Sequence, residues 1–182
     1  MNASERTGAS PPPGLIIRPA VEADLPRLTE IYNHYVVNTP TTFDTEPFTV
    51  EQRREWFSHY AGTGRHRLLV AGVDRVVAGY TSSSRYHPRA AYDTTVETTI
   101  LCAPEWIGHG LGHTMYAALF AALRDEDIHS IVALVTLPNK GSCALHEQFG
   151  FAQAGVIREA GRKFDRYWDV MIYQVMFRPP AP

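Results

Sequence analysis

Residues 94–123 read TTVETTILCAPEWIGHGLGHTMYAALFAAL, and this stretch decides the fold class. Thr94 to Ala103 is a run of β-forming residues, and Pro104 prevents it from continuing as a central strand. Glycines follow, and they lead into apolar residues repeated at helical spacing. The apolar positions of this predicted helix are Leu111, Met115, Ala118, Leu119 and Ala122. A strand, a glycine-rich turn and a helix are therefore expected in direct succession.

Strand-like and helix-like segments alternate on both sides of this unit. The expected strands are 15–18, 67–73, 76–82, 94–103, 130–137, 151–158 and 167–177. The expected helices begin near Leu25, near Val50, at Gly110 to Gly112 and at Ser142. The order β-α-α-β-β-β-α-β-α-β-β predicts an α/β fold with one central, mixed, partly parallel sheet flanked by helices.

Two of these segments carry more detailed expectations. Thr49 and Gln52 form a capping box, so the second helix is expected to begin there and to carry three aromatic residues inward: Trp56, Phe57 and Tyr60. Ser130 to Leu137 (SIVALVTL) is a continuous apolar run, which is typical of a strand covered on both faces.

Composition bounds the domain organisation. The chain has 182 residues, of which 45% are hydrophobic and 20% charged, and this fits one globular domain over residues 15–178. Residues 1–14 are rich in Ser, Gly and Pro, and with residues 179–182 they are expected to be flexible tails. The net charge of -2 gives no reason to expect nucleic acid or an anionic membrane as a partner.

The sequence also suggests a location. No segment reaches the roughly 18 apolar residues of a membrane span, and the N-terminus lacks the order of a signal peptide. Cys102 and Cys143 are too few for a disulfide scaffold and lack metal-ligand spacing, so we expect two free thiols. A cytoplasmic protein is the resulting expectation.

The glycine-rich turn, Pro104 to His113, is the first candidate for chemistry. Glycines let the backbone approach a phosphate, and free amides at a helix N-terminus attract negative charge. The alternative is a tight strand-to-helix turn that binds nothing. The segment lacks the Gly-Lys-Ser/Thr of a Walker loop and the GxGxxG of a dinucleotide fold.

Three side chains are further candidates. Glu97 lies inside a β-forming run, so it is either a solvent-facing residue or a general base in a semi-enclosed cleft. Asn139 and His146 are seven residues apart, or two helical turns, and can face one cleft. His109 and His113 are spaced like a metal pair, but no carboxylate completes the set, and we predict no metal.

Together these segments resemble the acetyl-CoA-binding core of the GNAT superfamily, and more narrowly the phosphinothricin and methionine sulfone/sulfoximine N-acetyltransferases. The resemblance runs from about Ile17 to Phe177. The matching stretches are IRPAVEADLPRLTEIYNHYV from Ile17, TFDTEPF from Thr42, RAAYDTTVETT from Arg89, GLG from Gly110, LPNKGSCALHEQFGF from Leu137 and AGRKFDRYWDV from Ala160.

The resemblance implies an N-acetyltransferase that uses acetyl-CoA as co-substrate and a small-molecule amine as acceptor. Glu97 would be the general base, and His146 would handle the proton of the leaving sulfur. The pantetheine arm would meet the backbone of Ile100, Leu101 and Cys102. The remaining cofactor contacts would come from the amides of Ile107, Gly108, His109, Gly110, Leu111, Gly112 and His113, together with Asn139 and Ser142. A homodimer is also implied, as is a link to antibiotic resistance.

Acceptor contacts follow from the same resemblance. Arg89 and Tyr92 would meet the acidic groups of the acceptor, Phe43 would form a pocket wall, and Arg85 and His87 would lie nearby. Family loops usually begin Gln/Arg-x-x-Gly, whereas Ile107 and Gly108 stand here, so side-chain contacts to the pyrophosphate are lost. Two alternatives stay open: an acyltransferase with another donor, such as a carrier-protein thioester, and a non-catalytic acyl-CoA sensor.

Overall fold

The computed structural model describes residues 12–177. Within these residues, seven strands and four α-helices follow one another in the predicted order, with three short 3-10 turns between them. The strands are β1 Ile16–Pro19, β2 Arg67–Val73, β3 Val76–Arg85, β4 Thr95–Cys102, β5 Ser130–Thr136, β6 Ala152–Lys163 and β7 Arg166–Met176. The helices are α1 Leu25–Asn38, α2 Val50–Ser58, α3 Leu111–Leu123 and α4 Lys140–Gln148. Of the two predicted tails, residues 1–11 and 179–182 lie outside the described residues.

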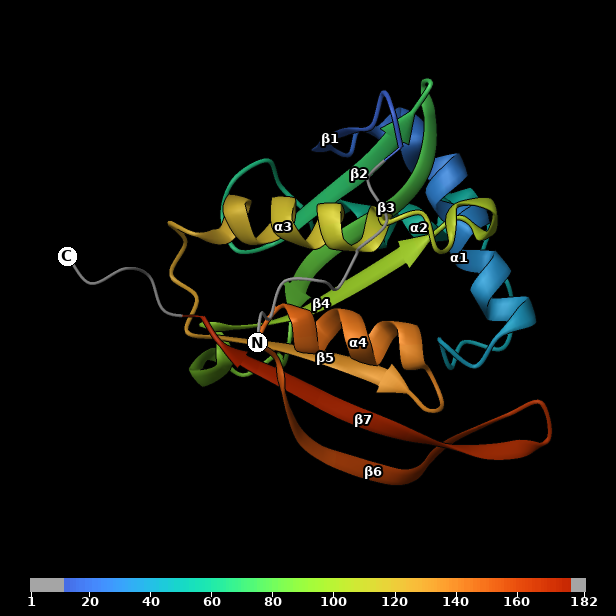
Figure 1. Ribbon diagram of the computed structural model, residues 1–182, viewed down its shortest axis with the longest axis vertical. Helices are drawn as coiled ribbons and strands as arrows, with labels where there is room; N and C mark the ends of the chain where they lie inside the picture. Colours follow the sequence, from blue (N-terminus) through green and yellow to red (C-terminus); the bar gives the residue numbers. More distant parts are fainter. Residues whose placement is uncertain (1–11, 178–182) are drawn as a thin grey trace, which may run out of the picture.

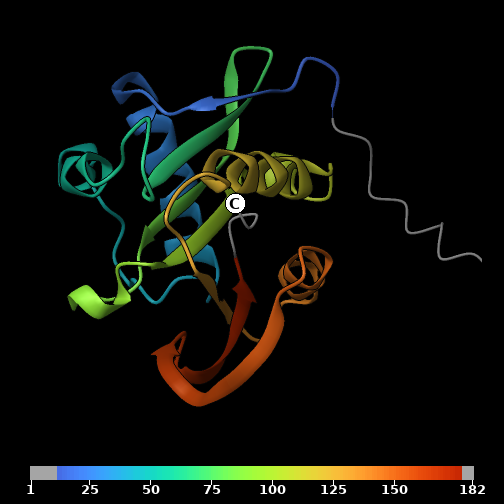
Figure 2. The same ribbon diagram turned by 90° about the vertical axis from the view of Figure 1, so that its left-hand side faces the viewer.

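The strands form a single mixed sheet in the order β1-β2-β3-β4-β5-β7-β6. Only the β4–β5 pair is parallel, and the other neighbours are antiparallel. Helices α3 and α4 cover one face, and α1 and α2 cover the other (Figures 1 and 2). The predicted α/β fold with a partly parallel sheet is therefore confirmed.

The central feature of the sheet is a split between β4 and β5. The two strands pair only from Thr95–Ser130 to Glu97–Val132. Beyond this point β4 stays paired with β3 as far as Cys102, and β5 stays paired with β7 as far as Thr136. Because β4 stays with β3 and β5 stays with β7, the C-terminal halves of β4 and β5 diverge (Figure 1).

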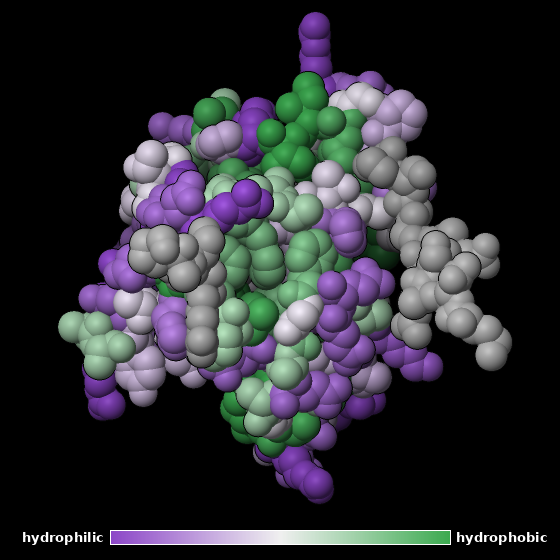
Figure 3. All heavy atoms as spheres, turned by 60° about the vertical axis from the view of Figure 1, so that its left-hand side comes forward, coloured by the Kyte–Doolittle hydropathy of each residue, from purple (hydrophilic) through white to green (hydrophobic). Residues whose placement is uncertain are grey.

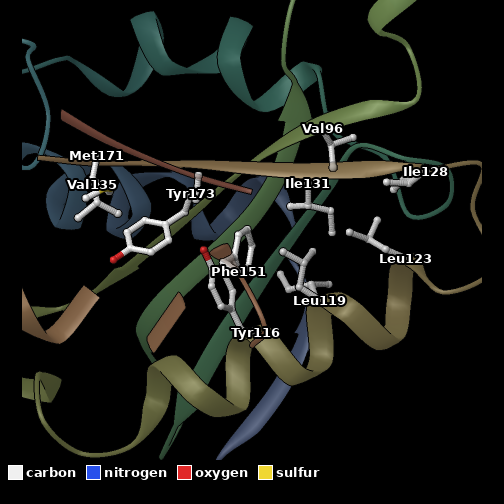
Figure 4. Close-up of a cluster of buried hydrophobic side chains, with 12 residues drawn as sticks. Val96, Tyr116, Leu119, Leu123, Ile128, Ile131, Val135, Phe151, Met171 and Tyr173 are labelled. Carbon is white, nitrogen blue, oxygen red and sulfur yellow. The ribbon is translucent and has the colours of Figure 1, made fainter. Parts of the chain in front are cut away.

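The core lies on both faces of the sheet. The larger cluster joins α3 to β5 and β7 and includes Tyr116, Leu119 and Tyr173, all fully buried (Figure 4). A second cluster packs α1 against β2 and β3, with Leu28 and Tyr80 at its centre. The two clusters lie on opposite faces of the sheet, and the larger one spans the split, since it contains residues of β2 and β4 as well as of β5 and β7.

Burial on α2 and β5 agrees with the expectations except at single positions. Trp56 and Phe57 of α2, and Tyr60 just beyond its end, are half-buried and pack against the second cluster as predicted, and the buried residue of this helix is Arg53. The capping box itself is confirmed, because the Gln52 amide donates to the Thr49 hydroxyl. On β5, six of the seven residues are buried and they lie on both faces, as predicted, whereas Leu134 is 47% exposed. Its position beside the split explains the exposure.

The surface agrees with a domain of balanced composition. On the face drawn in Figure 3, a hydrophobic area occupies the middle and hydrophilic residues surround it. Among the four α-helices described, none combines the length and the apolar character that a membrane crossing requires.

Candidate active site

A cavity of about 310 Å³ occupies the split. Glu97 reaches it from β4, Tyr116 from α3 and His146 from α4. The remaining lining residues are Tyr32, Thr41, Thr42, Phe43, Thr98, Thr99, Ile100, Leu101, Leu134, Val135, Thr136, Asn139, Ser142 and Val170. As their spacing predicts, Asn139 and His146 face one cleft.

Glu97 and His146 approach this cavity from opposite faces of the sheet. Side chains alternate along β4, and the Thr98 hydroxyl lies 3.2 Å from the Tyr116 hydroxyl on the α3 side. Glu97 and Thr99 therefore point to the side covered by α1 and α2. Because the split interrupts the sheet between β4 and β5, the cavity connects the two faces.

The Glu97 carboxyl is partly shielded from solvent. The residue is half-buried, and burial raises the pKa of its carboxyl above the usual value. A raised pKa brings a carboxylate closer to the basicity that a general base needs near neutral pH. Of the two alternatives for Glu97, the fold provides the semi-enclosed position and not the solvent-facing one.

His146 is almost fully buried, at 3% exposure, and both its ring nitrogens are engaged. Nδ1 lies 2.7 Å from the Ser142 carbonyl, which can only accept, so Nδ1 carries the proton. Burial lowers the pKa of His146, which keeps the ring neutral. Nε2 is then an acceptor, and the Tyr116 hydroxyl donates to it over 2.8 Å.

Tyr116 is a candidate that the sequence did not reveal. Its ring rises from α3 beside Phe151 (Figure 4), and its hydroxyl joins Thr98 to His146. An apolar helical stripe gives no sign that one aromatic member carries a hydroxyl into a cavity. The one signal in the sequence was that Tyr116 carries a hydroxyl on a helix expected to be buried, because a buried tyrosine hydroxyl usually needs a hydrogen-bond partner.

The edge of β4 that faces the split has free backbone groups. The Ala103 amide donates to the Ala78 carbonyl, so odd-numbered residues of β4 direct their backbone groups toward β3. The amides of Ile100 and Cys102 consequently face the split. Leu101 differs from the expectation, because its backbone faces β3 and pairs with Tyr80. The Cys102 carbonyl accepts from the Tyr35 hydroxyl over 2.7 Å.

The glycine-rich turn lies at the N-terminus of α3. Gly108 and Gly110 have φ values of 85° and 75°, a left-handed conformation that side-chain-bearing residues avoid. Ile107, Gly108 and His109 are exposed, and the first turn of α3 leaves free amides there. An exposed strand edge followed by such a turn fits a thioester arm and a pyrophosphate, so the residues present fit acetyl-CoA.

Three further cofactor candidates have structural roles that the sequence did not show. Gly112 allows α3 to approach α4, because an added Cβ would lie 3.1 Å from Leu145. His113 packs against the Phe149 ring. Asn139 is the N-cap of α4, where its side-chain oxygen accepts from the Ser142 amide over 3.1 Å.

The residues expected to bind the acceptor are not gathered in one place. Phe43 lines the central cavity. Arg85 lines a neighbouring cavity on the α2 side, where its guanidinium lies 3.3 Å from Asp93. The His87 and Tyr92 rings contact each other at a tilt, with centroids 4.8 Å apart, in the turn between β3 and β4.

The turn between β3 and β4 does not bring its three expected acceptor-binding residues to the central cavity. The Arg89 amide donates to His87 Nδ1, and a 3-10 turn over Ala90–Tyr92 directs the segment along the surface. Arg89 is exposed, and none of His87, Arg89 and Tyr92 lines the central cavity or the cavity beside Arg85. Within residues 12–177, only Phe43 of the five expected residues contacts the central cavity.

Comparison with known proteins decides the family. The family model of the acetyltransferase (GNAT) family matches residues 28–151. The chain belongs to this family. Like other GNAT proteins it is an acetyltransferase, and the chemistry expected from the sequence is confirmed at that level.

Two curated relatives and one solved structure cover most of this GNAT chain. The chain is 50% identical over 160 residues to phosphinothricin N-acetyltransferase of Streptomyces coelicolor, covering 87% of this chain and 94% of the relative. It is 32% identical over 163 residues to L-methionine sulfoximine/L-methionine sulfone acetyltransferase of Pseudomonas aeruginosa. This match covers 90% of this chain and 95% of the relative. The phosphinothricin acetyltransferase of Sinorhizobium meliloti, solved in complex with AcCoA, superimposes with a TM-score of 0.83 at 31% identity, covering 90% and 89%.

Proposed function

We propose that this chain transfers the acetyl group of acetyl-CoA to the amine of a small amino-acid-like acceptor such as phosphinothricin, methionine sulfone or methionine sulfoximine. One observation carries the proposal: Glu97 and the Tyr116–His146 pair line a single cavity from opposite faces of the split sheet. The names of the curated relatives support this class of acceptor.

The acceptor amine enters from the side of α1 and α2, where Glu97 points. An ammonium has no lone pair, so it must lose a proton before it attacks a carbonyl carbon. Glu97 accepts this proton, and its raised pKa makes it a better base than an exposed glutamate.

The donor lies along the free edge of β4. The Ile100 and Cys102 amides hold the pantetheine arm, and the amides from Gly108 to His113 at the N-terminus of α3 hold the pyrophosphate. When bound, the thioester supplies an electrophilic carbonyl. As the amine attacks, negative charge grows on the carbonyl oxygen of the thioester, and we assign the Ile100 amide as the hydrogen-bond donor that stabilises it.

The leaving sulfur takes its proton from the Tyr116–His146 pair. Tyr116 and His146 share one hydrogen bond, and both line the cavity. The acceptor ammonium loses two protons overall. Glu97 takes the first and passes it to solvent, and the second, released from the nitrogen after it attacks, replaces the proton that the pair gives to the sulfur. The pair and the carboxylate thus return to their starting states.

No covalent enzyme intermediate is part of the proposal. Burial raises the pKa of the Cys102 thiol to about 11, which keeps it protonated and a weak nucleophile near neutral pH. We therefore expect sequential kinetics, in which both substrates bind before either product leaves. An acetylated Cys102 or Cys143 on the reaction pathway would contradict this.

The test is a thiol-release screen. Acetyl-CoA is offered with phosphinothricin, methionine sulfone, methionine sulfoximine and ordinary amino acids, and turnover with the first three is the expected result. Turnover only with a carrier-protein thioester would replace the donor, and no thiol release with any amine would favour an acyl-CoA sensor.

Arg89 lies outside the central cavity, but the family resemblance places it at the acceptor's α-carboxylate, and a separate variant tests this assignment. Arg89→Ala is expected to raise KM for acceptors that bear an α-carboxylate by about tenfold, the equivalent of about 1.4 kcal/mol. KM for acetyl-CoA should not change. An equal loss for amines without a carboxylate would show that Arg89 acts only on the structure of its turn.

We also propose a cytoplasmic homodimer with a role in antibiotic resistance. Two free thiols and the use of acetyl-CoA suit the cytoplasm. The edge strand β6 exposes Val156 and Ile157, and an exposed apolar edge is a natural contact for a second copy. Light scattering after size exclusion tests the dimer, and a monomeric mass at working concentration contradicts it.

A further inference from the structure

A second, smaller site lies on the α2 side of the sheet, around a buried arginine. Arg53 of α2 is only 5% exposed, and its Nε and Nη2 atoms have no hydrogen-bond partner. Among residues 12–177, no carboxylate forms an ion pair with it. An uncompensated buried charge is costly, and native proteins rarely keep one without a role.

Aromatic rings hold this guanidinium in place without using its hydrogen-bond donors. Arg53 Cζ lies 3.6 Å from the Trp56 ring centroid and 4.2 Å from that of Tyr32. Such contacts engage the faces of the guanidinium, whereas its N–H groups lie in the plane. The donors of Arg53 therefore remain free to bind an anion in their own plane.

A second unpartnered donor faces the same space. Tyr80 of β3 is 1% exposed, and its hydroxyl has no partner. Both residues line a pocket of about 350 Å³. The other lining residues are Tyr32, Asp44, Phe48, Gln52, Trp56, Ser82 and Thr99. Asp44 does not pair with Arg53, because its carboxylate accepts from the Tyr32 hydroxyl instead.

This pocket adjoins the central cavity. Tyr32 and Thr99 line both. Thr99 follows Glu97 by two residues on the same face of β4, and two strand residues span about 7 Å. This is close to the separation between the amine and the terminal acidic group of a short amino acid.

We propose that Arg53 and Tyr80 form an oxyanion-binding subsite for the acceptor, and that it takes an acidic group on the acceptor's side chain. Arg53 supplies the positive charge and a planar set of donors, and Tyr80 adds a hydroxyl donor. The inference rests on the proposed function, because it assigns a specificity subsite to the same reaction. It also favours acceptors with a charged side chain over neutral ones.

Tyr80→Phe is the primary test, because it removes one oxygen atom that has no partner in the protein and should leave the melting temperature nearly unchanged. Arg53→Met removes the charge, Arg53→Lys keeps it without the planar fork, and Arg54→Met is the matched control. Arg54 is the adjacent residue, exposed and paired with Glu51 and Glu22.

The readout is KM for three acceptors with acetyl-CoA saturating: phosphinothricin, methionine sulfone and methionine amide. Tyr80→Phe and Arg53→Met should raise KM for phosphinothricin about tenfold or more, the equivalent of about 1.4 kcal/mol. The other two acceptors and the Arg54→Met variant should change little. A similar rise for methionine sulfone, but not for the amide, would overturn the assignment to the side-chain group, because it would place the α-carboxylate in the subsite instead. Equal losses for all three acceptors, or no change in KM, would overturn it.

A second measurement separates this inference from the proposed function. If the wild type acetylates no acceptor, the proposed function fails, and glutarate then probes the subsite directly. Glutarate should raise the melting temperature of the wild type and Arg54→Met but not of Tyr80→Phe. Equal shifts in all three proteins, or no shift in any, would overturn the subsite.

Discussion

The Tyr116 hydroxyl lies 2.8 Å from His146 Nε2, and this contact connects the wall of the cavity to a buried imidazole. The other ring nitrogen is fixed by the Ser142 carbonyl, so the imidazole cannot turn without losing a hydrogen bond. The Thr98 hydroxyl completes the chain on the β4 side. Strand β4 and helices α3 and α4 thus hold one chain of hydrogen-bonded side chains in place.

Tyr116→Phe is expected to lower kcat by about 10- to 100-fold, within the range typical of lost acid-base catalysis. KM for acetyl-CoA should stay close to that of the wild type, because the change removes one hydroxyl and no backbone contact. Initial rates of thiol release over a range of acetyl-CoA concentrations measure both constants. Tyr173→Phe is the matched control, since its ring stacks on His146 while its hydroxyl contacts Glu147 instead. Equal kcat values for the two variants would contradict a role for Tyr116.

Glu97→Gln keeps the shape of the side chain and removes the base. Turnover at neutral pH should fall by about 100-fold or more and recover in part as the pH rises, because hydroxide can then deprotonate the amine. In the wild type, burial raises the pKa of Glu97, so the acidic limb of kcat/KM should lie at higher pH than for an exposed glutamate. Glu55→Gln, at an exposed position on α2, is the control. A variant with the same pH profile as the wild type would remove Glu97 from the mechanism.

The sequence predicted the elements and their order because local patterns determine them. The capping box at Thr49 and the proline after the β4 run act on their own neighbours. The position of Glu97 in the cavity wall was also predictable, since a carboxylate inside a β-forming run needs an explanation. These signals require no knowledge of which segments meet in space.

Other features depend on packing between distant segments. Leu134 is exposed because β4 and β5 follow different neighbours, and the apolar run alone does not contain that fact. Arg53 is typical of an exposed helical charge until α1 and β3 enclose it. Arg89 lines neither the central cavity nor the cavity beside Arg85, because a short 3-10 turn sets the direction of its segment.

Gly110→Ala tests the turn at the N-terminus of α3. Gly110 has a φ of 75°, and an L-residue forced into this conformation costs roughly 1–2 kcal/mol of the free energy of unfolding. KM for acetyl-CoA should rise as well, because the turn presents its amides through this geometry. Denaturant unfolding and steady-state kinetics measure the two effects.

Gly141→Ala is the opposite case and serves as the control. Gly141 lies in the first turn of α4, where an added Cβ meets nothing within 4 Å. Alanine there should stabilise the protein by about 0.5–1 kcal/mol, since glycine has the greater freedom to lose on folding. If both variants lost equal stability, the left-handed conformation of Gly110 would not be the cause.

Asn139 combines a cap with a position in the cavity wall, and two substitutions separate these roles. Asn139→Ala removes the oxygen that accepts from the Ser142 amide and should cost about 1 kcal/mol of the free energy of unfolding. Asn139→Asp keeps a capping oxygen but has no N–H group to donate. If the amide contacts acetyl-CoA, Asn139→Asp raises its KM while the protein melts at nearly the wild-type temperature. If Asn139→Asp matches the wild type in both measurements, Asn139 is a helix cap only, and its place in the cofactor site must be given up.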